Sequence, residues 1–347
     1  MLGLKRPYAL LVAALVACCV LVTVAWVSVD RYLDAPLDVP GDGIAFDIVP
    51  GTAFVAISRE LSKSGVLDFP QVFSWYARLG GQAQSVQAGE YFIETGTTPR
   101  RLLQKFVAGD VKLYSFTIVE GWTYSEMISA LASHAAIENT LVFEDWPAFL
   151  ETLTTEYDHP EGLFLPETYL FPKYSKDSEV LEQAFYAMQV ALAEEWERRD
   201  VNLPFSTPYE ALILASIIEK ETALADERPM ISGVFVRRLQ KRMRLQTDPT
   251  VIYGIGNDFD GNLTRQHLRA DTSYNTYTRH GLPPTPIALP GLAAITAAMH
   301  PQGGNEIYFV ASGLGDGSHK FSATKAEHDA AVREYLSRQR ATRIQGK

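Results

Sequence analysis

The sequence predicts an α+β protein that begins with one membrane-spanning helix and becomes mostly helical toward its C-terminal end. Three observations support this: a long uncharged apolar segment near the N-terminus, a repeated pattern of strand, glycine turn and helix, and apolar segments with helical spacing that end in a hairpin. With 347 residues, 47% hydrophobic and 21% charged, the chain can bury a full core and has room for two domains. The net charge of −10 argues against a nucleic-acid partner, because such binding depends on neutralising phosphates.

The first predicted element is an uncharged apolar segment from Tyr8 to Val29, which is long enough to span a bilayer. Lys5 and Arg6 precede it, so the positive-inside rule predicts that residues 1–7 form a cytoplasmic tail and that the rest of the chain is exported. A cleaved signal peptide is the alternative, but it would have a shorter apolar core and a small-residue cleavage site. We therefore expect a single-pass anchor at residues 8–29.

Leu15 to Cys18 resembles a lipobox, in which cleavage would leave an acylated Cys18, but apolar residues continue to Val29, which a lipid tether does not need. Both cysteines, Cys18 and Cys19, lie inside the predicted span. The exported part therefore has no disulfide, thiol nucleophile or thiolate metal site.

A linker at residues 30–45 is followed by a pattern that occurs three times, beginning at Phe46, Tyr91 and Phe116. Each copy has an aromatic residue, an isoleucine two positions later, a glycine five positions later and then apolar residues at helical spacing, which predicts strand, glycine turn and helix. We expect residues 46–115 to form one subdomain and residues 116–347 a second domain.

The first copy, FDIVPGTAFVAISREL, resembles the opening half of a LysM module, a small βααβ fold that binds N-acetylglucosamine polymers. The resemblance implies a LysM-like α+β subdomain. A generic α+β unit is the alternative reading of the same pattern, and the repeats do not show that the subdomain binds sugar.

Beyond Trp122 the chain is predicted to be mostly helical and to end in a strand, loop, strand hairpin and a surface helix. The predicted helices are residues 125–132, 178–198, 208–222, 227–243 and 323–338, and the hairpin strands are residues 307–311 and 319–322.

The helix predicted at residues 208–222 is apolar on every side from Ala211 to Ile218 except for Ser216, so it should lie in the middle of a domain. It nevertheless runs into Glu219 and Glu221. Burial and a helix C-terminus both raise the pKa of a carboxyl group, and a carboxylic acid that stays protonated suits proton donation to a glycosidic oxygen. The alternative is a carboxylate that ends a helix and pairs with an arginine, and periodicity does not choose between the two glutamates.

Several segments together resemble the endolytic murein transglycosylases of the MltG (YceG-like) family. They are EGLFLPETYLFP, ASIIEKET, RLQKRMRLQTDPTVIYG, YNTYTRHGLPPTPIALPG and FVASGLGDGSHKFSATKAEH, in this order along the chain. The resemblance implies that Glu219, the first Glu of the E-K-E segment, is catalytic. It also implies an inner-membrane enzyme with a periplasmic catalytic domain that cuts the β-1,4 bond between N-acetylmuramic acid and N-acetylglucosamine and leaves 1,6-anhydromuramyl ends. Its partners would be peptidoglycan strands and peptidoglycan synthases of the penicillin-binding class.

Other polar residues in these segments are candidates for substrate binding. Gln246, Thr247 and Asp248 would line a sugar groove or open a turn, and Tyr274, Asn275 and Tyr277 offer phenol and amide groups beside a proline-rich loop. The candidates are completed by two carboxylates, Glu221 and Glu167. One departure from the family is Leu289, where the family usually has Asn, so a side-chain hydrogen bond from this position is in doubt.

The basic cluster at residues 237–244 would attract acidic stem peptides or form a solvated helix face. No H-E-x-x-H segment is present and the seven histidines are scattered, so we expect neither a metal site nor a cofactor. Two rival functions remain: a hydrolytic muramidase, which would need a second carboxylate such as Glu167 or Asp248 near Glu219, and a non-catalytic glycan-binding anchor that uses only the LysM-like part.

Overall fold

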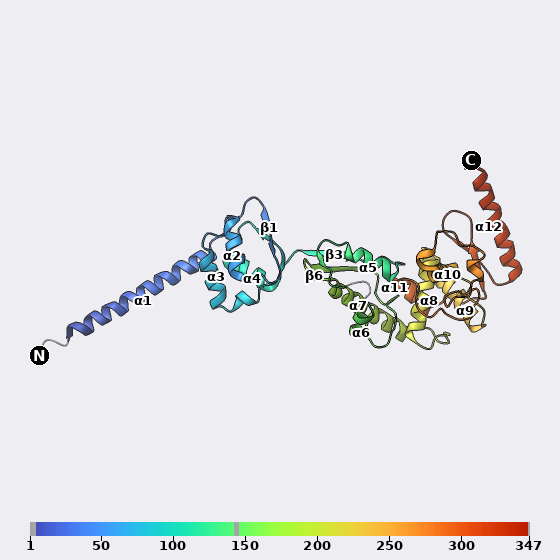
Figure 1. Ribbon diagram of the computed structural model, residues 1–347, viewed down its shortest axis with the longest axis horizontal. Helices are drawn as coiled ribbons and strands as arrows, with labels where there is room; N and C mark the ends of the chain where they lie inside the picture. Colours follow the sequence, from blue (N-terminus) through green and yellow to red (C-terminus); the bar gives the residue numbers. More distant parts are fainter. Residues whose placement is uncertain (1–4, 142–145, 346–347) are drawn as a thin grey trace. The chain divides into compact units, whose positions relative to one another are not determined.

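The computed structural model describes residues 5–141 and 146–345, and it divides into two compact units. Unit 1 comprises Met1–Tyr114 and Leu170–Ser175, and unit 2 comprises Ser115–Tyr169 and Lys176–Lys347 (Figure 1). Helices and strands are mixed along the chain, which confirms the α+β prediction. The assignment of a LysM-like subdomain and a catalytic domain stays a prediction.

The chain begins with helix α1 (Lys5–Asp34), whose segment Leu10–Asp34 is long and apolar enough to cross a membrane and is not buried. The predicted span at residues 8–29 lies inside this helix, whereas residues 1–4 of the predicted cytoplasmic tail are outside the described residues. Arg100 holds the C-terminal end of α1 to unit 1 through ion pairs with Asp30 at 2.7 Å and Asp34 at 2.8 Å.

Between α1 and residue 108, unit 1 has two strands with two helices between them and one helix after them, while β3 (Leu113–Thr117) and β5 (Thr168–Pro172) each have residues in both units. The order is β1 (Gly43–Ile48), α2 (Phe54–Lys63), α3 (Pro70–Leu79), β2 (Gly89–Glu94) and α4 (Pro99–Ala108), with a short 3-10 turn at Gln82–Gln84. Strands β1 and β2 pair antiparallel, so that Gly43 lies opposite Glu94 and Ile48 opposite Gly89.

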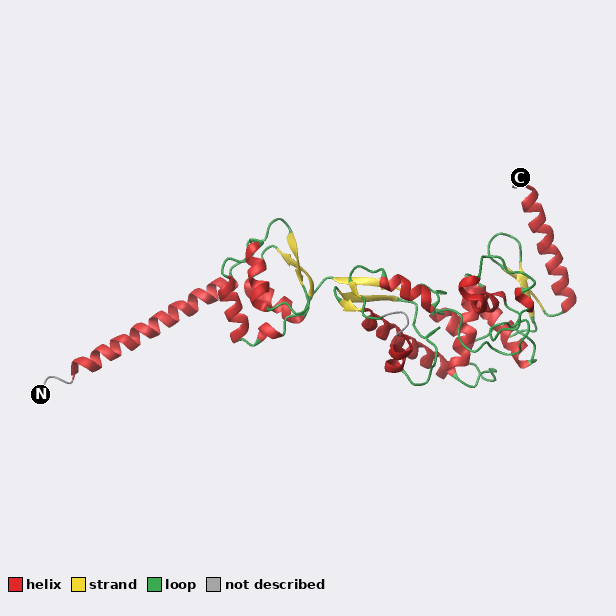
Figure 2. Ribbon diagram, viewed as in Figure 1, coloured by secondary structure: helices red, strands yellow, loops and turns green. Residues whose placement is uncertain are grey.

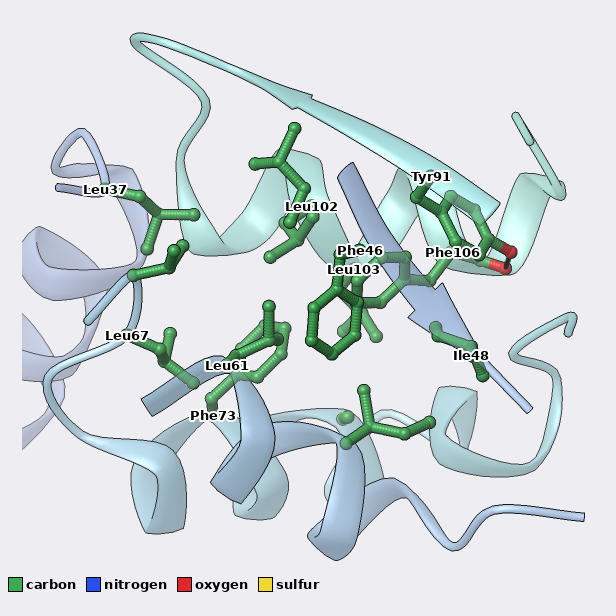
Figure 3. Packing of buried hydrophobic residues seen from close by; sticks show 14 of the residues in the cluster. Leu37, Phe46, Ile48, Leu61, Leu67, Phe73, Tyr91, Leu102, Leu103 and Phe106 are labelled. Atoms are coloured by element: carbon green, nitrogen blue, oxygen red, sulfur yellow. Dashed lines mark hydrogen bonds between the residues drawn. The ribbon is translucent and has the colours of Figure 1, made fainter. Parts of the chain in front are cut away.

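The core of unit 1 is formed by aromatic and aliphatic side chains from β1, β2 and helices α2, α3 and α4 (Figure 3). Phe106 packs against two other rings of this core, 4.7 Å from that of Tyr91 and 6.2 Å from that of Phe46. The Tyr91 hydroxyl donates to the carbonyl of Gln87 at 2.7 Å, which satisfies the one polar group that this ring buries.

The three copies of the repeated pattern each form the predicted strand and helix: β1 with α2, β2 with α4, and β3 (Leu113–Thr117) with α5 (Tyr124–Ala132). The glycine of each copy, Gly51, Gly96 or Gly121, has a positive φ of 78°, 86° or 79°. Only glycine adopts this conformation without strain, which explains why the pattern contains one at the same place.

Unit 2 contains short strands near its start and helices after them (Figure 2). Helix α5 is followed by β4 (Ile137–Glu138), α6 (Trp146–Leu153), β5 (Thr168–Pro172) and β6 (Ser175–Lys176). Strand β3 pairs with β5, and β4 pairs with β6.

The helical part of unit 2 surrounds helix α8 (Pro208–Glu221), which packs against α7 (Asp177–Arg198), α9 (Arg228–Gln240), α10 (Asp248–Ile255) and α11 (Leu292–Met299). Its residues from Ala211 to Ile218 are all buried, as its apolar sequence predicts. Short 3-10 turns lie at Ala225–Glu227, Gly256–Asp258 and His267–Arg269.

Helix α9 is shorter than the predicted 227–243. It ends at Gln240 because the chain turns sharply there, and Arg242 has a positive φ of 53°. The predicted hairpin is present as antiparallel strands β7 (Tyr308–Ala311) and β8 (His319–Ser322), and helix α12 (Lys325–Gln345) follows it.

The basic cluster is a solvated surface only in part: Lys241, Arg242 and Arg244 are exposed, whereas Arg237 and Arg238 donate hydrogen bonds to backbone carbonyls of unit 2. Arg238 is buried and donates to the carbonyls of Ile307 at 2.6 Å and Leu245 at 2.7 Å. Arg237 donates to the carbonyl of Glu306 at 2.7 Å. These side chains tie α9 to the C-terminal hairpin and to the loop that follows α9.

Candidate active site

Helix α8 has clear boundaries at both ends. Thr207 caps its first turn by accepting the N–H of Glu210 at 3.3 Å, and Pro208 occupies the first helical position, where a missing N–H costs nothing. The helix ends after Glu221 because Thr222 is extended, with φ −146° and ψ 139°. The two glutamates therefore lie in the last turn of a buried helix.

Glu219 is the centre of a polar cluster. Its side chain is 6% exposed, one carboxylate oxygen lies 3.2 Å from Arg228 Nη2, and the other accepts the backbone N–H of Gly291 at 3.0 Å. Gly291 precedes the first residue of α11, so its N–H belongs to the positive end of that helix dipole. The predicted alternative, a carboxylate that pairs with an arginine, is thus also realised at Glu219.

A second carboxylate lies beside this cluster. Glu120 Oε2 is 3.5 Å from the same Arg228 Nη2, so one guanidinium nitrogen lies between two carboxylates. A side chain at position 291 would collide with Glu120, since a Cβ built there would be 1.9 Å from Glu120 Oε1. Because Gly291 has no side chain, Glu120 and Glu219 can both lie beside Arg228.

The cluster opens onto a cleft of about 660 Å³. The cleft is lined by the loop Val119–Trp122, by Glu126, by the end of α8 and the following residues Glu219–Ala223, and by Arg228. The Lys220 ammonium donates to the carbonyl of Gly121 at 3.0 Å and holds the loop across the end of the helix. A volume of this size suits a ligand as large as a few sugar rings.

Burial raises the pKa of the Glu219 carboxyl group above its usual range. The Gly291 N–H and the Arg228 guanidinium act in the opposite direction, because both stabilise the charged form, while the negative charge of Glu120 adds to the rise. The outcome is a carboxyl group that gives up its proton less readily than an ordinary glutamate.

Glu221 has different surroundings, although it is only two residues away. It is more deeply buried, and its carboxylate accepts a hydrogen bond from the Thr247 hydroxyl. Burial raises its pKa as well, and the charges of His319 and Arg238 oppose that rise. Both glutamates line the cleft, but only Glu219 has an arginine within ion-pair distance among the described residues.

Three predicted substrate-binding residues lie around the start of α10. Gln246 is exposed and has a positive φ of 54°, Thr247 is buried and bonds Glu221, and Asp248 accepts the Tyr277 hydroxyl at 2.6 Å. These residues neighbour the cleft through Glu221, but they are not among the residues that line it.

Tyr274 and Asn275 have structural partners in the same region. The Tyr274 hydroxyl is 2.8 Å from the Thr285 hydroxyl. Asn275 is buried, and its amide donates to the carbonyl of Ala270 at 2.7 Å and to two further carbonyls in the preceding turn. The amide of Asn275 is thus occupied by its own loop.

The structure does not bring Glu167 to the cleft. Its side chain is exposed just before β5, and its carbonyl accepts the N–H of Ile118 at 3.0 Å. Within the same segment the buried carboxylate is instead Glu161, whose oxygens accept the N–H of Tyr124 at 2.9 Å and the Tyr253 hydroxyl at 3.0 Å.

Leu289 supports the cleft through its backbone. Its N–H donates to the carbonyl of Trp122 at 2.6 Å, and its carbonyl accepts the N–H of Gly121 at 2.9 Å, while the side chain is fully buried. These bonds need no side-chain amide, so they form with Leu at a position where the resembling family usually has Asn.

Sequence reasoning missed Arg228, Glu120 and Gly291, each from a different segment. Arg228 follows α8 closely, and the predicted pairing of a helix-terminal glutamate with an arginine was a signal for it. Nothing local pointed to Glu120 or Gly291. Among the described residues, no group of three His, Cys, Asp or Glu side chains is placed to hold a metal ion.

Comparisons with known proteins agree with one another. The profile of the YceG-like family matches residues 46–334. An endolytic murein transglycosylase of Bacillus subtilis is 30% identical over 311 residues, which are 85% of this chain and 85% of the relative. One from Streptococcus pneumoniae is 25% identical over 327 residues, and this chain spans 58% of its length.

A solved structure is also similar. The crystal structure of a putative YceG-like protein from Listeria monocytogenes matches with a TM-score of 0.54 and 28% identity, and the match covers 83% of this chain and 99% of the other. Since the family profile covers most of the chain, from the first strand to the last helix, this protein belongs to the YceG-like family.

Proposed function

We propose that this protein is an endolytic peptidoglycan lytic transglycosylase and that Glu219 is its catalytic residue. The observation that carries the proposal is a nearly buried carboxyl group with a raised pKa that opens onto a cleft in a member of this family. The relatives from Bacillus and Streptococcus are named endolytic murein transglycosylases, which supports a lyase acting within glycan strands.

In the first half of the reaction, the Glu219 carboxyl group protonates O4 of N-acetylglucosamine while the bond from this oxygen to C1 of N-acetylmuramic acid breaks. In the second half, the muramyl C6 hydroxyl attacks C1, and its proton returns to the Glu219 carboxylate. The C1–O6 bond closes the 1,6-anhydro ring, no water is consumed, and Glu219 ends in its starting state. One carboxyl group suffices because the nucleophile belongs to the substrate.

Arg228 and Gly291 stabilise the charge that appears on Glu219 after the first half. Each of them contacts one carboxylate oxygen, at 3.2 Å and 3.0 Å. When Glu219 is protonated, Arg228 can strengthen its pairing with Glu120, which lies 3.5 Å from the same nitrogen. The arginine therefore always has a carboxylate to pair with.

The hydrolytic rival requires a second carboxylate that activates water. Glu167 and Asp248, the residues expected for this role, do not line the cleft. The other alternative, a non-catalytic glycan-binding anchor, does not explain why unit 2 has a cleft with a buried carboxyl group. Neither rival accounts for the names of the relatives.

The chemistry of the new chain ends tests this function. The purified full-length protein, incubated with uncrosslinked glycan strands, should produce 1,6-anhydromuramyl ends, which are lighter than hydrolytic ends by one water and resist borohydride reduction. The intramolecular hydroxyl has a large advantage in effective concentration over water. Reducible chain ends would instead establish hydrolysis. Strands that remain uncut would favour the non-catalytic glycan-binding anchor.

We also propose that α1 anchors the protein in the inner membrane and that unit 2 lies in the periplasm. The ion pairs of Arg100 with Asp30 and Asp34 support retention of α1, because they make it part of unit 1. Protease added to intact spheroplasts should then digest nearly the whole chain. A protected C-terminal region would reverse this topology, and mass spectrometry of the purified protein would reveal acylation at Cys18.

For unit 1 we propose a LysM-like role in holding the glycan strand. The order of strand, helix, helix and strand supports this role, as does a cavity of about 820 Å³ between the turn after β1 and the segment before β2, with Thr52, Ser74 and Gln84 among its polar residues. Glycan strands are thus the expected partner of both units. Peptidoglycan synthases of the penicillin-binding class are the expected protein partners, and co-purification from crosslinked cells would test this.

A further inference from the structure

Helix α3 is apolar on two sides. Phe73 and Ala77 point into the core of unit 1, as the packing in Figure 3 shows for Phe73. Val72, Trp75, Tyr76 and Leu79 follow one another at the spacing of a second helix face. That face is open, with Trp75 69% and Leu79 82% exposed. A soluble domain rarely leaves such side chains together in water.

The open face of α3 lies beside the anchor helix. A cavity of about 690 Å³ is lined on one side by Val72, Trp75, Tyr76 and Leu79 of α3 and on the other by α1. The residues from α1 are Val22, Ala25, Trp26 and Val29, which have the same helical spacing. Both walls of the cavity are therefore apolar stripes.

The start of α3 is joined to the end of α1. The rings of Tyr32 and Phe69 meet edge to face at 5.4 Å, and the Tyr32 hydroxyl lies 3.5 Å from the Phe69 carbonyl. Arg100 adds the ion pairs to Asp30 and Asp34 and also donates to the Tyr76 hydroxyl at 2.9 Å. These contacts fix the cavity at the exported end of the predicted membrane span.

The position of the cavity along α1 indicates what fills it. Asp30 and Asp34 are charged and belong at the membrane surface, while Val22 lies about 12 Å further along the helix at a rise of about 1.5 Å per residue. One leaflet contributes about 15 Å of hydrocarbon. The α1 wall of the cavity, from Val22 to Val29, therefore lies within the hydrocarbon of the outer leaflet.

We infer that the open face of α3, formed by Phe69, Val72, Trp75, Tyr76 and Leu79, is a membrane-contact surface that inserts into the outer leaflet beside α1, with phospholipid acyl chains in the cavity between the two helices. Tryptophan and tyrosine rings favour this depth because they combine an apolar body with a polar group. The inference rests on the proposed anchoring by α1.

The polar neighbours of Trp75 fit the headgroup of the same lipid. A hollow of about 130 Å³ beside Trp75 is lined by Arg59 and Arg78, both of which are exposed. Neither arginine forms an ion pair within the described part of the chain. Two exposed arginines beside an inserted tryptophan would offer positive charge to the phospholipid phosphates.

The consequence for the protein is a unit 1 that rests on the membrane surface and does not swing freely on its anchor. An amphipathic helix that lies in the interface holds its domain at a fixed depth. The glycan held by this unit would then be the part of the strand nearest to the membrane.

Spin labels on the full-length protein in lipid nanodiscs test this surface. In a background with Cys18→Ala and Cys19→Ala, single labels are placed by Trp75→Cys and Leu79→Cys. Leu15→Cys in α1 provides a control in the lipid. Phe92→Cys on β2, an exposed apolar position that does not line the cavity, provides a control in water.

Oxygen, which concentrates in the lipid, should relax the spin labels at positions 75 and 79 more than a water-soluble nickel chelate does. The control label at 15 should behave in the same way. The control label at 92 should be relaxed more by the nickel chelate. If the nickel chelate relaxed the labels at 75 and 79 more than oxygen did, while oxygen still relaxed the label at 15, the membrane-contact inference would be overturned and the anchoring by α1 would be retained. Labels at 75 and 79 that neither reagent reaches would mean a protein partner and would also overturn it. A label at 15 exposed to nickel would mean that the anchoring itself is wrong.

Discussion

Two buried glutamates of unit 2, Glu219 at the end of α8 and Glu161 before β5, differ in one respect that matters for chemistry. Burial raises the pKa of both, in the case of Glu161 to about 7. Glu161 is bonded to neutral donors, the backbone N–H groups of Tyr124 and Gly162 and the Tyr253 hydroxyl, and does not line the cleft. Glu219 contacts Arg228 and opens onto the cleft. A raised pKa alone therefore reports burial, and access to the cleft together with a nearby cation distinguishes the proposed catalytic acid, Glu219, from Glu161.

The largest expected effect is that of Glu219→Gln. The amide fits the same space and can still accept the N–H of Gly291, but it cannot deliver a proton. Loss of general acid catalysis costs about 100-fold to 10,000-fold in rate. Cleavage of glycan strands by the purified variant would be measured together with its thermal stability.

The matched control for this variant is Glu221→Gln, two residues further along the same helix. The amide oxygen can keep the bond from Thr247, so activity should fall by less than about tenfold. Near-normal turnover of Glu219→Gln with loss of activity in Glu221→Gln would transfer the catalytic role to Glu221.

An intermediate effect is expected from Arg228→Gln, seen mainly in the pH dependence. Arg228 lowers the pKa of Glu219, so its removal should raise that pKa. In the proposed mechanism Glu219 must be protonated to start the reaction, so activity should be lost as pH rises through its pKa. In the variant this loss of activity should move to higher pH by about one unit. The loss of charge stabilisation should lower kcat/KM by about tenfold to about a hundredfold, since a hydrogen bond to a charged group contributes about 1.5–3 kcal/mol.

Glu120→Gln should move the pH at which activity is lost in the opposite direction, to lower pH. The negative charge of Glu120 raises the pKa of Glu219, so its removal should lower that pKa and bring the loss of activity to lower pH. The shift should be smaller than for Arg228, because the Glu120 side chain is 47% exposed and water screens its charge. If both variants moved the pH of activity loss in the same direction, Glu219 would not be the group whose titration causes that loss.

The smallest effect on activity is expected from Glu161→Gln, which should change stability instead. The carboxyl group has a pKa of about 7 in the folded protein and an ordinary value of 4.5 when unfolded, so the folded state loses stability as pH rises from about 4.5 to about 7. The cost above pH 7 is about 3 kcal/mol at most. The melting temperature of the variant should therefore depend less on pH over this range. A parallel dependence in both proteins would contradict the role of Glu161.

Local patterns in the sequence predicted much of the fold, because those patterns are set by neighbouring residues. The glycines of the three repeats marked turns that need a positive φ, and the apolar segment of α8 marked a buried helix. The end of α9 was wrong by three residues because the turn at Arg242 has no glycine to announce it.

The site was predicted only in part, because its members come from distant segments. The end of the buried helix narrowed the candidates to Glu219 and Glu221, and the resemblance to the family selected Glu219. Arg228, Glu120 and Gly291 meet it only through the packing of α8, α9 and α11. In the segment before β5, Glu167 was chosen because it interrupts an apolar sequence. In the structure residues 161–166 are all buried and the chain reaches the surface at Glu167, so the interior carboxylate of this segment is Glu161.

The position of Arg228 between two carboxylates has a consequence for the energy profile of the reaction. A residue that first donates and then recovers a proton serves both halves best when its acid form and its base form are of comparable free energy. The Arg228 guanidinium can pair more closely with Glu219 or with Glu120, and can thus offset the change of charge on Glu219 with little movement of the backbone. In the proposed mechanism, this would bring the barriers of the two halves closer in height.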